Sequence, residues 1–114
     1  MVQAHTVLRR GQLFRVRHPS GDPKASRVFV VVARAVALQS RLPVVACVPV
    51  HSQRLGLATE VPVGITEGLL QDSAIRCDGI TSLARAVLTD YVGELDPQLL
   101  MQLNQALKIA LDLE

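Results

Sequence analysis

Residues 28–32 read VFVVV, and residues 43–50 read PVVACVPV. Both are uninterrupted apolar runs rich in β-branched side chains, which predicts two buried strands at the centre of a sheet. Pro49 stands near the end of the second run, where a strand tolerates the loss of one backbone donor. Shorter segments around them predict further strands over residues 11–16, 59–63, 73–77, 80–85 and 88–94. The middle of the chain therefore predicts a sheet of five or more strands.

The end of the chain has a helical periodicity instead. Asp96 is a favourable N-cap, and Pro97 suits the first helical position. Apolar residues then recur at helical spacing, at Leu100, Leu103, Leu107 and Ala110. We expect a helix over residues 96–113 and a loose tail over residues 1–8. With 114 residues and no internal repeat, the chain is expected to be a single domain, mainly β with a C-terminal α-helix.

The composition narrows the classes of function. The chain is 49% hydrophobic, but its only aromatic residues are Phe14, Phe29 and Tyr91, so the core is expected to be aliphatic. An exposed aromatic platform for stacking bases is not expected. Cys47 and Cys77 lie inside apolar stretches without CxxC or CxxH spacing, which indicates reduced core thiols and no metal site. No apolar run is long enough to span a membrane, and residues 1–10 do not resemble a signal peptide. We therefore expect a cytoplasmic protein without a cofactor.

The net charge of +2 hides an asymmetry between the two halves. Up to Leu57 there are nine basic residues and one acid, Asp22, whereas from Ala58 onward there are three basic residues and nine acids. All but one of the basic residues in the first half are arginines, whose planar guanidinium suits bidentate phosphate contacts. The first half therefore favours an anionic partner. The alternative is that the two halves neutralise each other in the folded protein.

Two polar loops adjoin the central strands. The first spans residues 17–26 and leads directly into Arg27. The second spans residues 51–57 and begins with His51 and Ser52. If the strands are neighbours, an arginine, a histidine and a hydroxyl converge at one edge of the sheet. Such a trio can cleave a phosphodiester without metal, because imidazole transfers protons near neutrality and arginine stabilises the extra negative charge. Only RNA supplies the internal 2′-hydroxyl nucleophile. The alternative is a solvated histidine and an arginine that guards the edge of the sheet.

The order of these segments resembles that of the MazF/PemK toxin endoribonucleases. RRGQLFRV at residues 9–16 is similar to the family's first strand, and PSGDPKAS at residues 19–26 with Arg27 resembles its glycine-containing loop ending in arginine. PVVACVPVHSQRLGLATEVPV at residues 43–63 is similar to the third strand and the loop after it. Residues 73–113 resemble the end of the family's domain, which closes with a helix.

The resemblance implies an SH3-like β-barrel, also found in the CcdB toxins, with a C-terminal helix. It further implies a homodimer, cleavage of single-stranded RNA at short sequences, and neutralisation by a MazE-like antitoxin with an acidic tail. By resemblance, Arg27 is the loop-ending catalytic arginine, His51 stands where the family usually has a phosphate-contacting threonine, and Ser52 provides a second hydroxyl. The basic residues expected to bind RNA are Arg17, Lys24, Arg54 and Arg76, with Asp78 and Thr81 added by the resemblance.

The chain departs from the family pattern at two positions. Thr81 stands where many members carry a second catalytic arginine, and Val28 replaces the proline that normally follows the first. Three interpretations follow: His51 transfers the proton with Arg27 as its partner, Arg76 reaches the site instead, or activity is lost. The leading hypothesis is a metal-independent endoribonuclease toxin. The rivals are a CcdB-like toxin that binds DNA gyrase and an inactive relative that binds RNA or an antitoxin.

Overall fold

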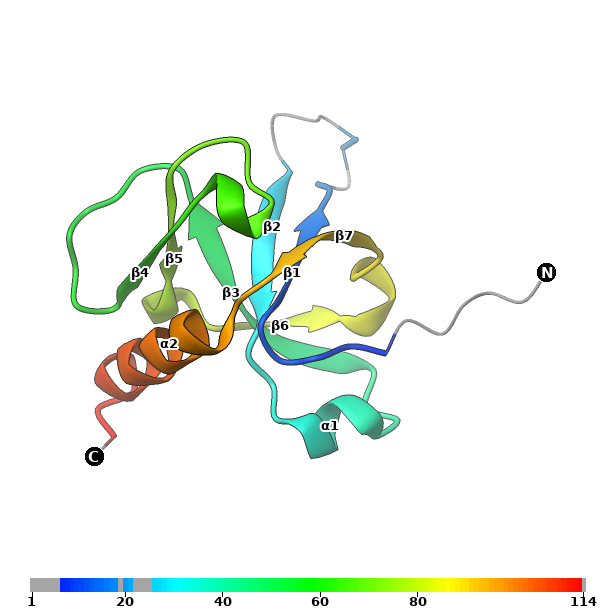
Figure 1. Ribbon diagram of the computed structural model, residues 1–114. Helices are drawn as coiled ribbons and strands as arrows, with labels where there is room; N and C mark the ends of the chain where they lie inside the picture. The colour runs from blue at the N-terminus through cyan, green and yellow to red at the C-terminus, as the bar shows by residue number, and fades with distance from the viewer. Residues whose placement is uncertain (1–6, 19, 22–25, 114) are drawn as a thin grey trace.

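The computed structural model describes residues 7–18, 20–21 and 26–113. It contains a curled β-sheet, a short helix and a longer C-terminal helix (Figure 1). The strands are β1 (Gln12–Val16), β2 (Arg27–Val31), β3 (Val44–His51), β4 (Glu60–Val63), β5 (Ser73–Arg76), β6 (Thr81–Ala84) and β7 (Asp90–Glu94). The helices are α1 (Ala35–Gln39) and α2 (Pro97–Ala110), with single 3-10 turns η2 (Ile65–Glu67), η3 (Cys77–Gly79) and η4 (Arg85–Val87). The predicted mainly β fold with a C-terminal helix is confirmed.

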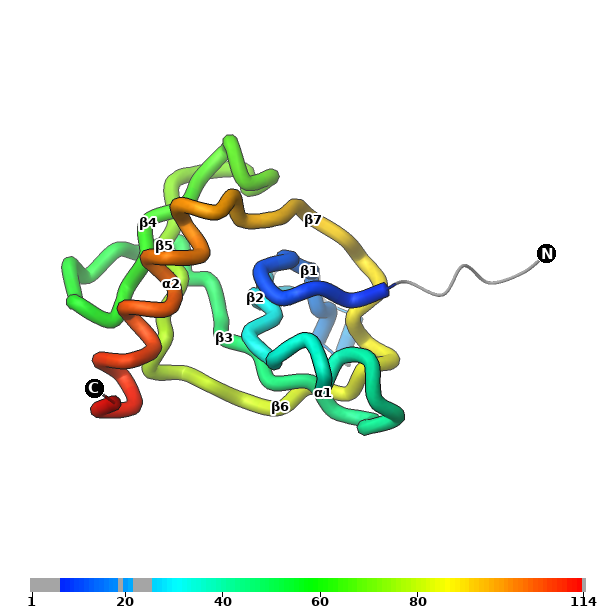
Figure 2. Tube along the Cα trace, turned by 60° about the horizontal axis from the view of Figure 1, so that its bottom comes forward, coloured from blue at the N-terminus to red at the C-terminus, as the bar shows by residue number. Residues whose placement is uncertain are grey.

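All the strand pairs are antiparallel, in the order β4-β5-β3-β2-β1-β7. β3 lies at the centre, as its apolar run predicts, with β2 along one side. Its other side is divided, because β6 pairs with Val44–Cys47 and β5 pairs with Val50 and His51. This division curls the sheet into a half-barrel, with β7 and β6 on opposite sides of β1 and β2 (Figure 2).

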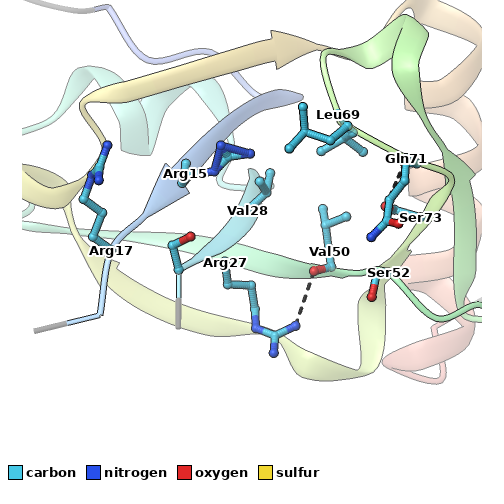
Figure 3. Close-up of a pocket in the computed structure, with 11 residues that line it drawn as sticks. Arg15, Arg17, Arg27, Val28, Val50, Ser52, Leu69, Gln71 and Ser73 are labelled. Carbon is cyan, nitrogen blue, oxygen red and sulfur yellow. Dashed lines mark hydrogen bonds between the residues drawn. The ribbon is translucent and has the colours of Figure 1, made fainter. Parts of the chain in front are cut away.

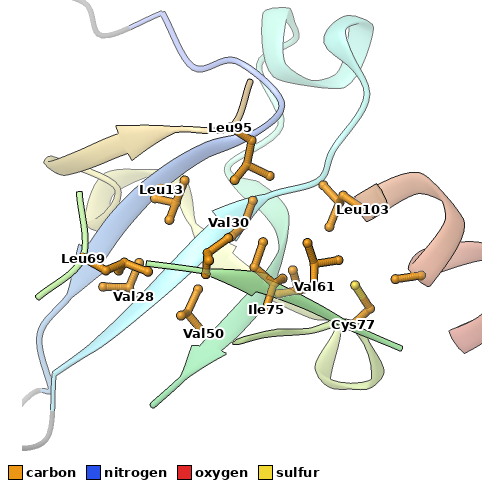
Figure 4. Close-up of a cluster of buried hydrophobic side chains, with 13 residues drawn as sticks. Leu13, Val28, Val30, Val50, Val61, Leu69, Ile75, Cys77, Leu95 and Leu103 are labelled. Atoms are coloured by element: carbon orange, nitrogen blue, oxygen red, sulfur yellow. The ribbon is translucent and has the colours of Figure 1, made fainter. Parts of the chain in front are cut away.

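The alternating side chains of the central strands fill two cores, one on each face of the sheet. The inner core joins β1–β5 to α2 and includes Leu13, Val30, Val50 and Ile75 (Figure 4). The second core, on the opposite face, includes Phe14, Val31, Cys47 and Leu38 of α1. Neighbouring residues such as Leu13 and Phe14 thus enter different cores, because strand side chains alternate between faces. Burial on both faces explains why the central strands are continuously apolar.

Helix α2 begins as the sequence predicts. The side chain of Asp96 accepts a hydrogen bond from the backbone N–H of Leu99 at 2.8 Å, and Pro97 is the first helical residue. Leu103 is fully buried against the inner core. The helix ends at Ala110 rather than at residue 113, because Asp112 adopts a positive φ of 56° that an α-helix cannot contain.

The N-terminal segment is packed earlier than predicted. Residues 1–6 of the expected loose tail lie outside the described residues, but Leu8 is only 6% exposed and belongs to the second core. Leu8 therefore belongs to the packed domain and not to the expected tail. Within the described part of the chain, no helix has the length and apolarity needed to cross a membrane.

Candidate functional site

Arg27 and His51 meet where β2 begins and β3 ends. The β2–β3 register pairs Phe29 with Pro49, and two residues further along it brings Arg27 beside His51. Nη1 of Arg27 lies 2.8 Å from Nδ1 of His51 and also donates to the backbone carbonyl of Val50 at 3.4 Å. The predicted convergence of these two residues is therefore present in the structure. His51 differs in one respect from the prediction: it is the last residue of β3, not the first residue of a loop.

The contact with Arg27 fixes the arrangement of protons on His51. A guanidinium has no acceptor, so Nδ1 must accept the hydrogen bond, and the proton of the neutral imidazole then resides on Nε2. Burial lowers the pKa of His51, the positive charges of Arg27 and Arg76 lower it further, and the charge of Glu60 opposes them. These effects favour the neutral imidazole of His51 near neutral pH. Its Nδ1 accepts from the guanidinium of Arg27, a cation that can also bind a phosphate.

A cavity of about 560 Å³ opens beside this pair, on the inner face of the sheet. Val28, Val50 and Leu69 form its apolar part, and Arg15, Arg17 and Arg27 form its basic side (Figure 3). Ser52, Gln71 and Ser73 supply neutral polar groups on its other side. The guanidinium of Arg27 turns away from Arg15 and toward the carbonyl of Val50, so it lies at the rim (Figure 3).

Two of the predicted residues line this cavity together with Arg27. Ser52 follows His51 and therefore lies on the other face of the strand end, in the cavity rather than beside the imidazole. Arg17 lies on the cavity wall, where its guanidinium is 3.6 Å from the carboxylate of Asp90. Arg15 and Gln71 also line the cavity, although neither is among the site residues predicted from the sequence. The two-residue period from Leu13 is the signal that places Arg15 on the inner face.

Arg54 and Arg76 instead hold the loop between β3 and β4. Arg54 donates to the carbonyls of Ser73 at 2.9 Å and Val63 at 3.0 Å. Arg76 donates to the carbonyl of Gln53 at 2.9 Å and forms an ion pair with Glu60 at 3.1 Å. Both guanidinium groups therefore bind groups of the protein itself. The charge of Arg76 still acts on His51, and contact of Arg54 or Arg76 with RNA stays a prediction.

Glu60, which is not among the residues predicted from the sequence, organises the same loop. Its side chain is only 4% exposed. One carboxylate oxygen accepts the backbone N–H groups of Leu55, Gly56 and Leu57 at 2.9, 2.9 and 3.3 Å, while the other accepts from Arg76. Burial alone raises the pKa of Glu60, but these hydrogen bonds outweigh it and hold the pKa below its ordinary value.

The remaining predicted residues lie elsewhere. Asp78 is in η3 and accepts a hydrogen bond from the hydroxyl of Thr59. Thr81 begins β6 opposite Cys47, which is four residues, or about 13 Å, along β3 from His51. The structure thus separates Thr81 from the Arg27–His51 pair. Lys24 lies outside the described residues.

The two cysteines are free and fully buried. Burial raises the pKa of Cys47 to about 12, and burial together with the charge of Asp78 raises the pKa of Cys77 to about 11. Neither thiol is a nucleophile near neutral pH. Among the residues that the structure describes, no group of three or more His, Cys, Asp or Glu side chains is placed to hold a metal ion.

Comparison with known proteins assigns the family. Residues 9–111 match the model of the PemK-like, MazF-like toxins of type II toxin–antitoxin systems. The chain belongs to this family. The toxin's Arg27 and His51, at the paired ends of two central strands, are thus located within the matched domain.

Solved structures agree with the family match. The toxin MazF-mt6 of Mycobacterium tuberculosis is 27% identical to this chain, with a TM-score of 0.78. The match covers 90% of this chain and 98% of MazF-mt6. A mycobacterial endoribonuclease in complex with its cognate antitoxin is 26% identical, with a TM-score of 0.78 and coverage of 92% and 95%. A MazE–MazF complex from Deinococcus radiodurans, at 21% identity and a TM-score of 0.75, covers 95% of this chain and 98% of its own, and shows the likeness of fold. The family match therefore identifies this chain as the toxin component of a type II toxin–antitoxin system.

Proposed function

We propose that this toxin is a metal-independent, sequence-specific endoribonuclease that cleaves single-stranded RNA. The observation that carries the proposal is the 2.8 Å contact between Arg27 and His51 at the rim of a basic cavity. The family match, and the mycobacterial endoribonuclease of similar fold and 26% identity, support the reaction class.

In the proposed mechanism, the phosphate of the substrate takes the place of His51 as the partner of Arg27. The guanidinium binds the non-bridging oxygens and stabilises the additional charge of the transition state. Nδ1 of His51, released from Arg27, then accepts the proton of the ribose 2′-hydroxyl. The 2′-oxygen bonds to phosphorus, the bond to the 5′-oxygen breaks, and that oxygen takes a proton from solvent. The products are a 2′,3′-cyclic phosphate and a 5′-hydroxyl.

The mechanism gives Ser52 a role in binding and Thr81 none in catalysis. Ser52 lines the same cavity as Arg27, on its other side, where its hydroxyl can donate a hydrogen bond to a phosphate oxygen. Thr81 is about 13 Å along β3 from His51, so an arginine at that position is not a required part of this scheme. His51 supplies the proton acceptor instead.

The direct test incubates the toxin with long single-stranded RNA in EDTA and maps the cut ends. We expect cuts at a recurring short sequence, cyclic phosphate ends, and no cutting of an RNA carrying 2′-deoxyribose at the cut position. Arg27→Ala is expected to remove most activity while preserving the fold. Arg41→Ala is the matched control, because Arg41 is exposed and does not line the cavity. Wild-type activity in Arg27→Ala would refute the assignment of Arg27. If no RNA is cut, the endoribonuclease proposal is wrong, and a toxin that binds gyrase becomes the leading alternative.

We propose further that the toxin is a cytoplasmic homodimer. The support is a hollow along α2 and the chain end that includes the apolar side chains of Met101, Leu111 and Leu113, each more than half exposed. Burying such a surface stabilises an association. Sedimentation at micromolar concentration is expected to show the dimer, and only monomer there would contradict it.

We also propose that a MazE-like antitoxin with an acidic segment inhibits the toxin. The basic wall of Arg15, Arg17 and Arg27 is complementary to such a segment. A peptide of this kind is expected to compete with RNA, with an apparent affinity that falls as salt is raised. Binding that leaves RNA cleavage unaffected would contradict this mode of inhibition.

A further inference from the structure

We propose that the cavity beside Arg27 is a nucleobase pocket in which Arg15 and Gln71 select the base next to the cleaved phosphate. This inference rests on the proposed endoribonuclease function and adds a specificity-determining site to it. The chemistry it predicts is recognition of a base that presents two adjacent acceptor atoms.

The first observation is that Arg15 is partly buried in the cavity without a counter-ion among the residues that the structure describes. Arg15 pairs in register with Val28 on one side and Asp90 on the other. The carboxylate of Asp90 lies 3.6 Å from Arg17 instead, and Arg15 makes no hydrogen bond or ion pair with any described residue. A guanidinium held there has five donors and an open cavity before it, which favours an acceptor-rich ligand.

The second observation is the shape of the cavity. Val28, Val50 and Leu69 present aliphatic surface, and about 560 Å³ is ample for one nucleotide (Figure 3). The amide of Gln71 stands across from Arg15, and its side chain makes no hydrogen bond with the described part of the protein. Aliphatic surface with donors and acceptors at its edges fits a flat base rather than a second phosphate.

The third observation is the position of the cavity relative to the reaction. Arg27 lines its rim and contacts His51, whose side chain lies on the other face of β3 from Val50. A phosphate bound to Arg27 at the strand ends therefore leaves an adjoining nucleotide free to turn into the cavity. No carboxylate belongs to the described residues that line it, so the cavity does not repel RNA.

The planar guanidinium of Arg15, whose N–H donors form a fixed fork that can bind two adjacent acceptors, predicts which bases fit the cavity. Guanine offers O6 and N7 as adjacent acceptors, and an unpaired cytosine offers N3 and O2, whereas adenine and uracil lack such a pair. We therefore expect guanine or cytosine at one position beside the cut. Gln71, which can donate and accept, is expected to choose between these two bases.

The test measures both cleavage and binding, so that failure of the pocket is distinguishable from failure of catalysis. A randomised RNA is cleaved and the cut sites are sequenced. In parallel, affinity is measured for RNAs that carry 2′-deoxyribose at the cut position and each of the four bases beside it. Arg15→Met, Arg15→Lys and Gln71→Ala are compared with Arg41→Met, which removes an exposed arginine outside the cavity.

We expect Arg15→Met to reduce the preference for guanine or cytosine by about tenfold at that position alone, the discrimination typical of one bidentate arginine contact. Arg15→Lys keeps the charge but not the fork, so it is expected to lose the same preference while retaining overall affinity. Gln71→Ala is expected to equalise guanine and cytosine, and Arg41→Met is expected to leave every preference unchanged.

Three results would overturn the inference. Equal loss of affinity for all four bases in Arg15→Met, with rescue by Arg15→Lys, would show a phosphate contact. Unchanged base preference in both Arg15 variants would remove the pocket from RNA recognition. Loss of affinity for an antitoxin peptide but not for RNA would assign the cavity to a protein partner. If no variant cleaves RNA, the binding measurements still decide between these results.

Discussion

Removal of the carboxylate of Glu60 is expected to loosen the loop that follows His51. In Glu60→Ala, the backbone N–H groups of Leu55, Gly56 and Leu57 lose their acceptor, and Arg76 loses its ion-pair partner. The amides lie near solvent and can bond to water, so each loses about 0.5 kcal/mol. The charge-assisted bonds from Arg76 add about 1.5 kcal/mol. The expected loss in the free energy of unfolding is about 3 kcal/mol.

A loss of this size is measurable without abolishing the fold. At this chain length it corresponds to a fall in the melting temperature of about 12 °C. Hydrogen exchange measured by mass spectrometry is expected to show faster exchange confined to residues 52–57. Glu60→Gln is the matched variant, because its amide oxygen can still accept the backbone N–H groups while the charge that pairs with Arg76 is lost. It is expected to lose about half as much stability.

The sign of the pH dependence follows from the lowered pKa of Glu60. Its contribution to stability is fully present above the ordinary pKa of about 4.3 and is lost as the pH falls through the lower, folded value. The difference in stability between the wild type and Glu60→Gln is therefore expected to be largest at neutral pH and to narrow below about pH 4.3. A melting temperature of Glu60→Ala within 2 °C of the wild type would refute the reasoning, because the hydrogen bonds would then contribute almost nothing.

Three further predictions concern the Arg27–His51 pair, the close approach of Gly93 to Glu67, and the two cysteines. Because the pKa of His51 is lowered, kcat/KM is expected to fall only below about pH 6.5, and this acid limb should vanish in His51→Gln; an identical profile would return His51 to a structural role. Gly93→Ala places a Cβ 2.1 Å from the backbone oxygen of Glu67 and is expected to cost about 3 kcal/mol by chemical denaturation; unchanged stability would contradict this close contact. Cys47 and Cys77 are expected to resist a thiol reagent at pH 8 until the protein unfolds, and rapid labelling of the native protein would contradict their burial.

The sequence by itself determined the elements of the fold. The apolar runs at residues 28–32 and 43–50 became the central strands β2 and β3, and Asp96 and Pro97 begin α2 as predicted. These features are local, because apolar periodicity and capping depend on residues close together in the chain. The meeting of Arg27 and His51 was also predictable, since both flank central strands that become neighbours.

Only the tertiary structure decided which polar side chains face the cavity and which stabilise the fold. Arg54 and Arg76 are basic residues of the kind that binds RNA. In the structure both donate to backbone carbonyl groups, and Arg76 also pairs with Glu60, whereas Arg15 faces the cavity. His51 and Ser52 are adjacent in sequence but lie on opposite faces at the end of β3. The physical reason is that a hydrogen bond or an ion pair depends on distance and direction in space. The curl of the sheet fixes both through contacts between residues far apart in the chain, such as the pairing of His51 with Ala74.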